Sequence, residues 1–179
     1  MVMHVSEKDP SDERGTLLAF LEAQRGGIRR ALLGLSDEDA STKPSASELS
    51  LSGLVKHVAE VEDVWVRMAQ GLPPTVHRDA STWADSFRLV EGETVAERLA
   101  HWAAVAAETE RFVLSVPSLE DTFPLPDAPW FPADTRVSMR WLVLHLIEET
   151  ARHAGHADVI RESLDGKTSH QLVAEAEAK

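Results

Sequence analysis

Apolar residues recur along this chain at spacings of three and four, in four long segments separated by polar, proline-containing stretches. This period matches one face of an α-helix and not the alternation of a strand. Gly26 and Gly27 weaken the middle of the first segment without ending it. We expect four helices, over about residues 12–34, from a cap at Ser50 or Ser52 to Gln70, from a capping box at Thr94 to Val116, and from Ser138 to Leu164.

The segments between the predicted helices are rich in residues that favour turns. Residues 36–50 are expected to form a plain connection, and residues 72–92 an irregular crossing segment or a short helix. Residues 117–136 contain five prolines and are expected to form a long ordered loop of the kind that often covers a site. We treat residues 1–11 and 167–179 as flexible tails, with a short helix as the alternative for the second.

No strand alternation and no internal repeat stands out in the sequence. The pattern therefore predicts an all-α fold, a four-helix bundle of the up-and-down type, whose exact topology the two connections of about 20 residues leave open. At 179 residues, of which 43% are hydrophobic, the chain has the size and composition of a single domain, residues 1–179.

The charge balance restricts the partners, because 18 Lys and Arg face 30 Asp and Glu, a net charge of -12. Such a surplus of negative charge opposes binding to nucleic acid and to anionic membranes. No signal-peptide core is present, and no apolar run approaches the ~18 residues that cross a bilayer, so we expect a cytoplasmic protein. The sequence has no cysteine, so any metal must be held by nitrogen and oxygen ligands.

The fourth predicted helix carries a polar stripe of His145, Glu149, His153 and His156. At about 100° per residue these positions fall within an arc of roughly 80°. Apolar residues lie on or beside this arc, which indicates that the stripe points partly into the bundle, where ionisable groups need partners. Glu149 and His153 are one turn apart, the separation at which two side chains can hold a single ion.

A third ligand must come from another helix. His57 is our candidate, because outside the fourth helix it is the only histidine within a strongly apolar helix interior. Two imidazoles and one carboxylate suit zinc, nickel or ferrous iron, and three protein ligands leave further positions open. The sequence therefore predicts a divalent metal site made of His57, Glu149 and His153. A hydrogen-bonded network of the same three side chains without metal is the alternative.

Other histidines are assigned supporting or surface positions. We expect His145 and His156 to line a pocket or to support the ligands. A fourth ligand from His156 would instead close the site, as in structural zinc centres. His77 and His101 are expected at the surface.

Two further pairs of residues are candidates for the surroundings of the site. Trp130 and Phe131, in the proline-rich loop, are the aromatic residues that we expect to line a pocket. Glu60 and Glu148 are expected to lie at solvated helix edges or to bond to a ligand imidazole.

Two segments of the sequence carry a resemblance to a known family. They are Leu51-Ser-Gly-Leu-Val-Lys-His57-Val-Ala-Glu60 and Trp141-Leu-Val-Leu-His-Leu-Ile-Glu-Glu-Thr-Ala-Arg-His153-Ala-Gly-His156-Ala-Asp. With them the chain resembles the DinB-like family, in particular its actinobacterial mini-circle protein branch. Members are four-helix bundles, commonly dimers, with a metal site made by a histidine of the second helix and an H-x-x-x-H pair on the last long helix. His57 and His153 match this pattern, whereas Glu149 replaces the first histidine of the pair, as in the site of mycothiol-dependent maleylpyruvate isomerase.

The resemblance implies a function as well as a fold. Zinc would be the metal, and the chain would be a homodimeric S-transferase that uses a low-molecular-weight thiol such as mycothiol. The metal would bind the thiol as thiolate, which then attacks a small electrophile. A metal-binding or stress-response bundle protein without catalysis is the alternative within the same family.

Overall fold

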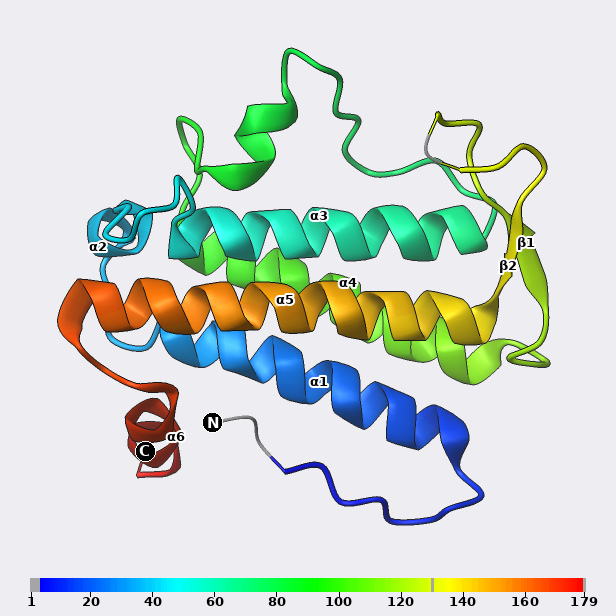
Figure 1. The fold of residues 1–179 in the computed structure, drawn as a ribbon, viewed down its shortest axis with the longest axis horizontal. Helices are drawn as coiled ribbons and strands as arrows, with labels where there is room; N and C mark the ends of the chain where they lie inside the picture. The colour runs from blue at the N-terminus through cyan, green and yellow to red at the C-terminus, as the bar shows by residue number, and fades with distance from the viewer. Residues whose placement is uncertain (1–3, 130, 179) are drawn as a thin grey trace.

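The computed structural model describes residues 4–129 and 131–178, and four long helices lie side by side in it (Figure 1). They are α1 (Glu13–Ala31), α3 (Leu51–Ala69), α4 (Val95–Ser115) and α5 (Met139–Asp165). The predicted all-α four-helix bundle is thereby confirmed. Within the described ranges, no helix is both long and apolar enough to cross a membrane.

Each long helix begins at a side chain that accepts a hydrogen bond from the first helical turn. These caps satisfy backbone N–H groups that have no partner inside the helix. Helix α5 ends at Asp165 and is capped by Gly166, whose φ of 78° is left-handed, as predicted for a glycine stop. Helix α1 runs through Gly26 and Gly27 without interruption and ends at Ala31, before the predicted residue 34. The capping residues are Asp12, Ser50, Thr94 and Ser138.

Helices α3 and α4 run in the same direction, which differs from the predicted up-and-down order (Figure 1). Near their N-terminal ends Lys56 forms an ion pair with Glu93, and near their C-terminal ends Gln70 donates a hydrogen bond to Glu108. The chain between them must therefore return along the length of α3, which explains why this connection is long. It contains the 3-10 helix η1 (Trp83–Phe87), the short helix that was one of its two predicted forms.

The core consists of two clusters of buried apolar side chains, one toward each end of the bundle. Helix α3 is buried on most of its circumference, because α4, α5 and the segment around η1 all contact it. The largest fully buried side chain is Trp102 of α4. Burial of such side chains is the main force that holds the helices together.

The carboxylate of Glu62 on α3 lies inside this core and is 2% exposed. It accepts hydrogen bonds from the guanidinium of Arg25 on α1, from the indole N–H of Trp102 at 3.0 Å and from the hydroxyl of Thr109 at 2.5 Å. A buried charge is stable only when it is paired and hydrogen-bonded. The network thus fixes α3, which carries His57, relative to α1 and α4.

Two of the predicted connections contain short regular elements. Helix α2 (Asp37–Ser41) forms in the first connection. In the proline-rich connection, β1 (Thr122–Pro124) and β2 (Arg136–Ser138) pair antiparallel, and Phe123 of β1 is buried in the core. This segment was expected to be a loop, and its strands were not foreseen because three residues are too few to show alternation.

The chain beyond α5 forms a further helix, α6 (Ser169–Glu177), the helical alternative for this segment. Thr168 and Gln171 form a capping box at its start. Leu172 and Val173 are buried, and α6 contacts α1.

Candidate metal centre

Helices α3 and α5 bring His57, Glu149 and His153 together, as the sequence predicted. His57 lies in the second turn of α3, and Glu149 and His153 lie one turn apart in the middle of α5. The Nε2 atoms of His153 and His57 lie 3.1 Å and 3.4 Å from the same oxygen of Glu149, Oε1. The two imidazole rings meet edge to face, with centroids 4.9 Å apart.

The spacing of these donor atoms fits a metal ion. One donor atom from each residue lies within 4.8 Å of the other two. A tetrahedral ion with bonds of about 2.0–2.2 Å places its donors about 3.3–3.6 Å apart, close to the two His–Glu distances above. Two nitrogens and one carboxylate oxygen suit zinc, nickel or ferrous iron. Across the part of the chain that the structure describes, this is the one group of three or more donors with such a spacing.

The charge on Glu149 also favours a cation. Hydrogen bonds with His153 and then with His57 hold the pKa of the Glu149 carboxyl well below its ordinary value of 4.5, although burial acts in the opposite direction. This matters because a carboxylate is a metal ligand only in its deprotonated form. Burial lowers the pKa of neighbouring His145 below its ordinary value of 6.5, which favours its neutral form.

His145 and His156 flank the cluster on α5 and lie outside its set of close donors. His145 stacks on Trp141 with ring centroids 4.9 Å apart and an angle of 7° between the planes. His156 places its Nδ1 atom 3.3 Å from Nδ1 of His153, the ring nitrogen that faces away from Glu149. A contact at the second ring nitrogen is of the kind that orients a metal-ligating histidine, so His156 stays a predicted supporting residue.

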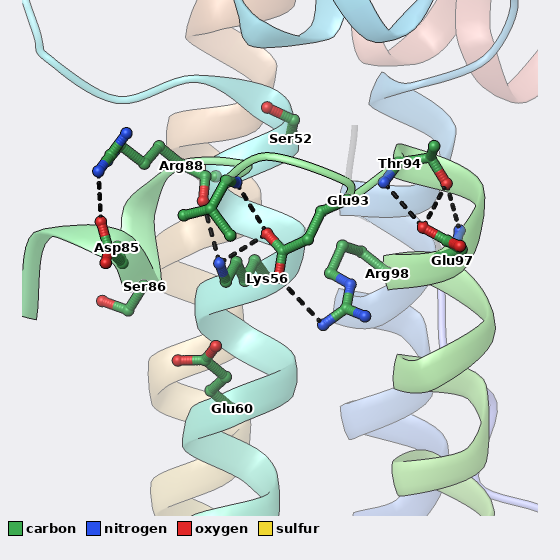
Figure 2. A network of polar contacts seen from close by, with 12 residues as sticks. Ser52, Lys56, Glu60, Asp85, Ser86, Arg88, Glu93, Thr94, Glu97 and Arg98 are labelled. Carbon is green, nitrogen blue, oxygen red and sulfur yellow. Dashed lines mark hydrogen bonds and ion pairs between the residues drawn. The ribbon is translucent and has the colours of Figure 1, made fainter. Parts of the chain in front are cut away.

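A support that sequence reasoning missed lies on the other side of His57. Phe87, the last residue of η1, stacks on the imidazole, with centroids 4.1 Å apart and an angle of 22° between the planes. The following segment is held against α3 by the ammonium of Lys56, which donates to Glu93 at 2.7 Å and to the carbonyl oxygen of Arg88 at 3.2 Å (Figure 2). Phe87 thus packs on one face of the His57 ring, and the Lys56–Glu93 ion pair holds the segment after Phe87 against α3.

Glu93 is the centre of this network, as Figure 2 shows. Burial acts to raise its pKa, but hydrogen bonds from Lys56 and from the backbone N–H of Val90 outweigh burial and hold the pKa below its ordinary value. Arg98 adds a second cation at 3.6 Å. Lys56 stands in an apolar run of the sequence, where a lysine needs a buried partner. The position of Lys56 in the sequence therefore indicated that it has a partner, but it did not identify Glu93 as that partner.

Glu60 does not lie at the solvated helix edge that was predicted for it, whereas Glu148 does. Glu60 is buried and accepts a two-pronged hydrogen bond from Arg78, with distances of 2.9 Å from Nε and 2.5 Å from Nη2. The expected solvated edge was wrong because the crossing segment, which carries Arg78, folds over this face of α3. Glu148 is exposed and lies 3.9 Å from Arg152.

A pocket of about 380 Å³ adjoins the cluster, and His57 lies in its wall. Helix α3 forms one side of it, and the crossing segment and Phe131 form the other. Phe131 therefore lies where the sequence predicted, and Trp130 lies outside the described residues. His77 is exposed at the pocket and His101 is partly exposed on α4, both in agreement with their predicted surface positions.

The fold and the clustered donors define a helical-bundle protein with a candidate metal centre between its second and last long helices. Residues 16–166 match the family model described as mycothiol-S-transferase, and the chain belongs to this DinB-like family. The fold is similar to that in the crystal structure of a conserved protein from Enterococcus faecalis, with a TM-score of 0.68 and 18% sequence identity, covering 87% of this chain and 98% of that chain. A search among curated proteins gave no match.

Proposed function

We propose that this protein is a metal-dependent S-transferase that joins a low-molecular-weight thiol, mycothiol, to a small electrophile. The observation that carries the proposal is the cluster of His57, Glu149 and His153 at the wall of an apolar pocket. The match to the mycothiol-S-transferase family supports the thiol. A cytoplasmic location and a homodimer are part of the same proposal.

The three clustered side chains would hold the ion, with zinc as the first choice and nickel or iron as alternatives. When bound, a divalent ion would supply a Lewis acid that favours the thiolate form of the substrate over the thiol form. Glu149 contributes negative charge, and His57 and His153 contribute neutral nitrogens. Phe87 and His156 keep the two imidazoles oriented through the contacts described above.

The residues that line the pocket would bring the electrophile to the sulfur of the thiol. In the transfer, a sulfur–carbon bond forms and the leaving group departs with the electron pair of the broken bond, while the thiol proton goes to solvent. The pocket beside His57 excludes water from the reacting carbon and holds it close to the thiol. Positioning of this kind is a major source of rate enhancement in two-substrate reactions.

The proposal is tested by incubating zinc-loaded protein with mycothiol and chlorodinitrobenzene and measuring the thioether by mass spectrometry. We expect formation above the uncatalysed rate, and a loss of at least about 100-fold in His57→Ala and His153→Ala. His170→Ala, at an exposed histidine of α6, is the matched control and should keep the wild-type rate. A wild-type rate equal to the uncatalysed one, with zinc bound, would overturn the proposal.

A further inference from the structure

The pocket over α3 opens onto the candidate metal centre, because His57 belongs to both. Its volume of about 380 Å³ lies near the lower end of the roughly 300–1,000 Å³ that is usual for small-molecule sites. We infer that it binds the electrophile of the transfer reaction and selects uncharged, apolar electrophiles over carboxylates. This inference rests on the proposed function and adds the class of the second substrate.

The lining of the pocket is predominantly apolar. Val61, Val64, Trp65 and Met68 of α3 face Phe131 across it. Covering such a surface with an apolar ligand favours binding by about 25 cal/mol for each Å² of apolar surface removed from water. It offers few partners to a cysteine-derived thiol such as mycothiol, whose amide and hydroxyl groups would lose their hydrogen bonds to water there. The pocket therefore suits the electrophile and not the body of the thiol.

The charges in the wall cancel one another. Among the described lining residues, Arg78 is the one arginine or lysine and Glu60 the one carboxylate, and the two form the two-pronged ion pair described above. A third nitrogen of Arg78, Nη1, lies 3.5 Å from the carbonyl oxygen of Thr82. The guanidinium is thus already satisfied, and a carboxylate substrate would find no unpaired arginine or lysine among the described lining residues.

The mouth of the pocket carries an aromatic side chain that is suited to contact a ligand. Trp83 is 57% exposed, although it lines the pocket and lies with its ring 6.2 Å from that of Phe87. A flat, apolar ligand would cover part of this surface and stack on it. Because Trp83 and His57 line the same pocket, a ligand that fills it from Trp83 would extend toward the metal centre.

The inference is tested by equilibrium dialysis of metal-free protein with nitrobenzene and with meta-nitrobenzoate, two unreactive probes that differ by one carboxylate. We expect wild-type protein to bind nitrobenzene at least about 10-fold more tightly. Glu60→Gln keeps the shape of the side chain and releases Arg78, so it should tighten meta-nitrobenzoate binding about 10-fold and change nitrobenzene binding by less than about two-fold. Glu148→Gln, at an exposed carboxylate of α5, should change neither.

A second pair of variants tests where the probe binds. Val64→Asp places a charge in the wall and should weaken nitrobenzene binding by at least about 10-fold. Val159→Asp makes the same change at an exposed position of α5 and should leave binding unchanged. Circular dichroism establishes that each variant is folded before its binding is compared.

Three results would overturn the inference: no binding of either probe, equal binding of both by wild-type protein, or an unchanged ratio in folded Glu60→Gln. Because dialysis uses neither thiol nor metal, its outcome is separate from that of the transferase assay. Absence of thioether formation would remove the proposed function even if nitrobenzene binds, whereas failure of the probes to bind would remove only the electrophile site.

Discussion

Replacing Glu62 with alanine removes the acceptor that Arg25, Trp102 and Thr109 share in the core. The guanidinium of Arg25 would remain buried, and among the described residues Glu22, at 3.4 Å, would be left to offset its charge. Breaking a buried ion pair in this way costs about 3–5 kcal/mol. The loss at Thr109 is smaller, since its hydroxyl also lies 3.0 Å from the carbonyl oxygen of Val105. We expect the free energy of unfolding to fall by about 4 kcal/mol.

The assay is urea unfolding of metal-free protein, followed by tryptophan fluorescence and circular dichroism. With a denaturant slope of about 2–3 kcal/mol per M, the midpoint should fall by about 1.3–2 M. Glu148→Ala, which removes an exposed carboxylate 3.9 Å from Arg152, should cost less than about 0.5 kcal/mol. The combined change of Arg25→Met and Glu62→Leu should recover much of the loss, because no unpaired charge remains. A loss below about 1 kcal/mol for Glu62→Ala would refute the reasoning.

Three further predictions concern the surroundings of the site. In thermal unfolding, Gly53→Ala should lower the melting temperature, because a Cβ there would overlap the carbonyl oxygen of Phe87. Gly155→Ala should instead raise the free energy of unfolding by about 0.5–1 kcal/mol, because its Cβ would meet no atom within 4 Å. Lys56→Met, which leaves the partly buried carboxylate of Glu93 without its main partner, should cost about 2 kcal/mol in urea unfolding. In metal-free protein the depressed pKa of the Glu149 carboxyl adds stability above pH 4.5, and this contribution is lost as the pH falls toward the folded-state pKa. Glu149→Gln should therefore flatten the acid limb of a curve of unfolding free energy against pH. An acid limb in Glu149→Gln that is as steep as in wild-type protein would contradict the role given to Glu149. Equal effects of the two glycine changes would contradict the close approach of Phe87 to Gly53.

The helices could be predicted because their signals are local. The apolar period and the capping residues Ser50, Thr94 and Ser138 stand in the sequence itself, and all three cap the helices where they were expected. The direction of α4 relative to α3 is not a local property. It depends on where the chain between them crosses, and a long connection is compatible with either direction.

The candidate centre was predictable for a similar reason. Glu149 and His153 share a helix face by spacing alone, and His57 stood out as a histidine inside an apolar helix. The contacts of Phe87 with His57 and of Arg78 with Glu60 join α3 to a segment without regular period. Such contacts are set by tertiary packing, so no local pattern in the sequence predicts them.

The most direct test of the account is the metal content of protein purified without chelators or an affinity tag, measured by elemental analysis. We predict about one divalent ion per chain, lost in His57→Ala and in His153→Ala and retained in His170→Ala. If wild-type protein holds no ion even after incubation with zinc or nickel, or if both variants keep the wild-type content, the three side chains form a hydrogen-bonded network and the proposed metal centre is wrong.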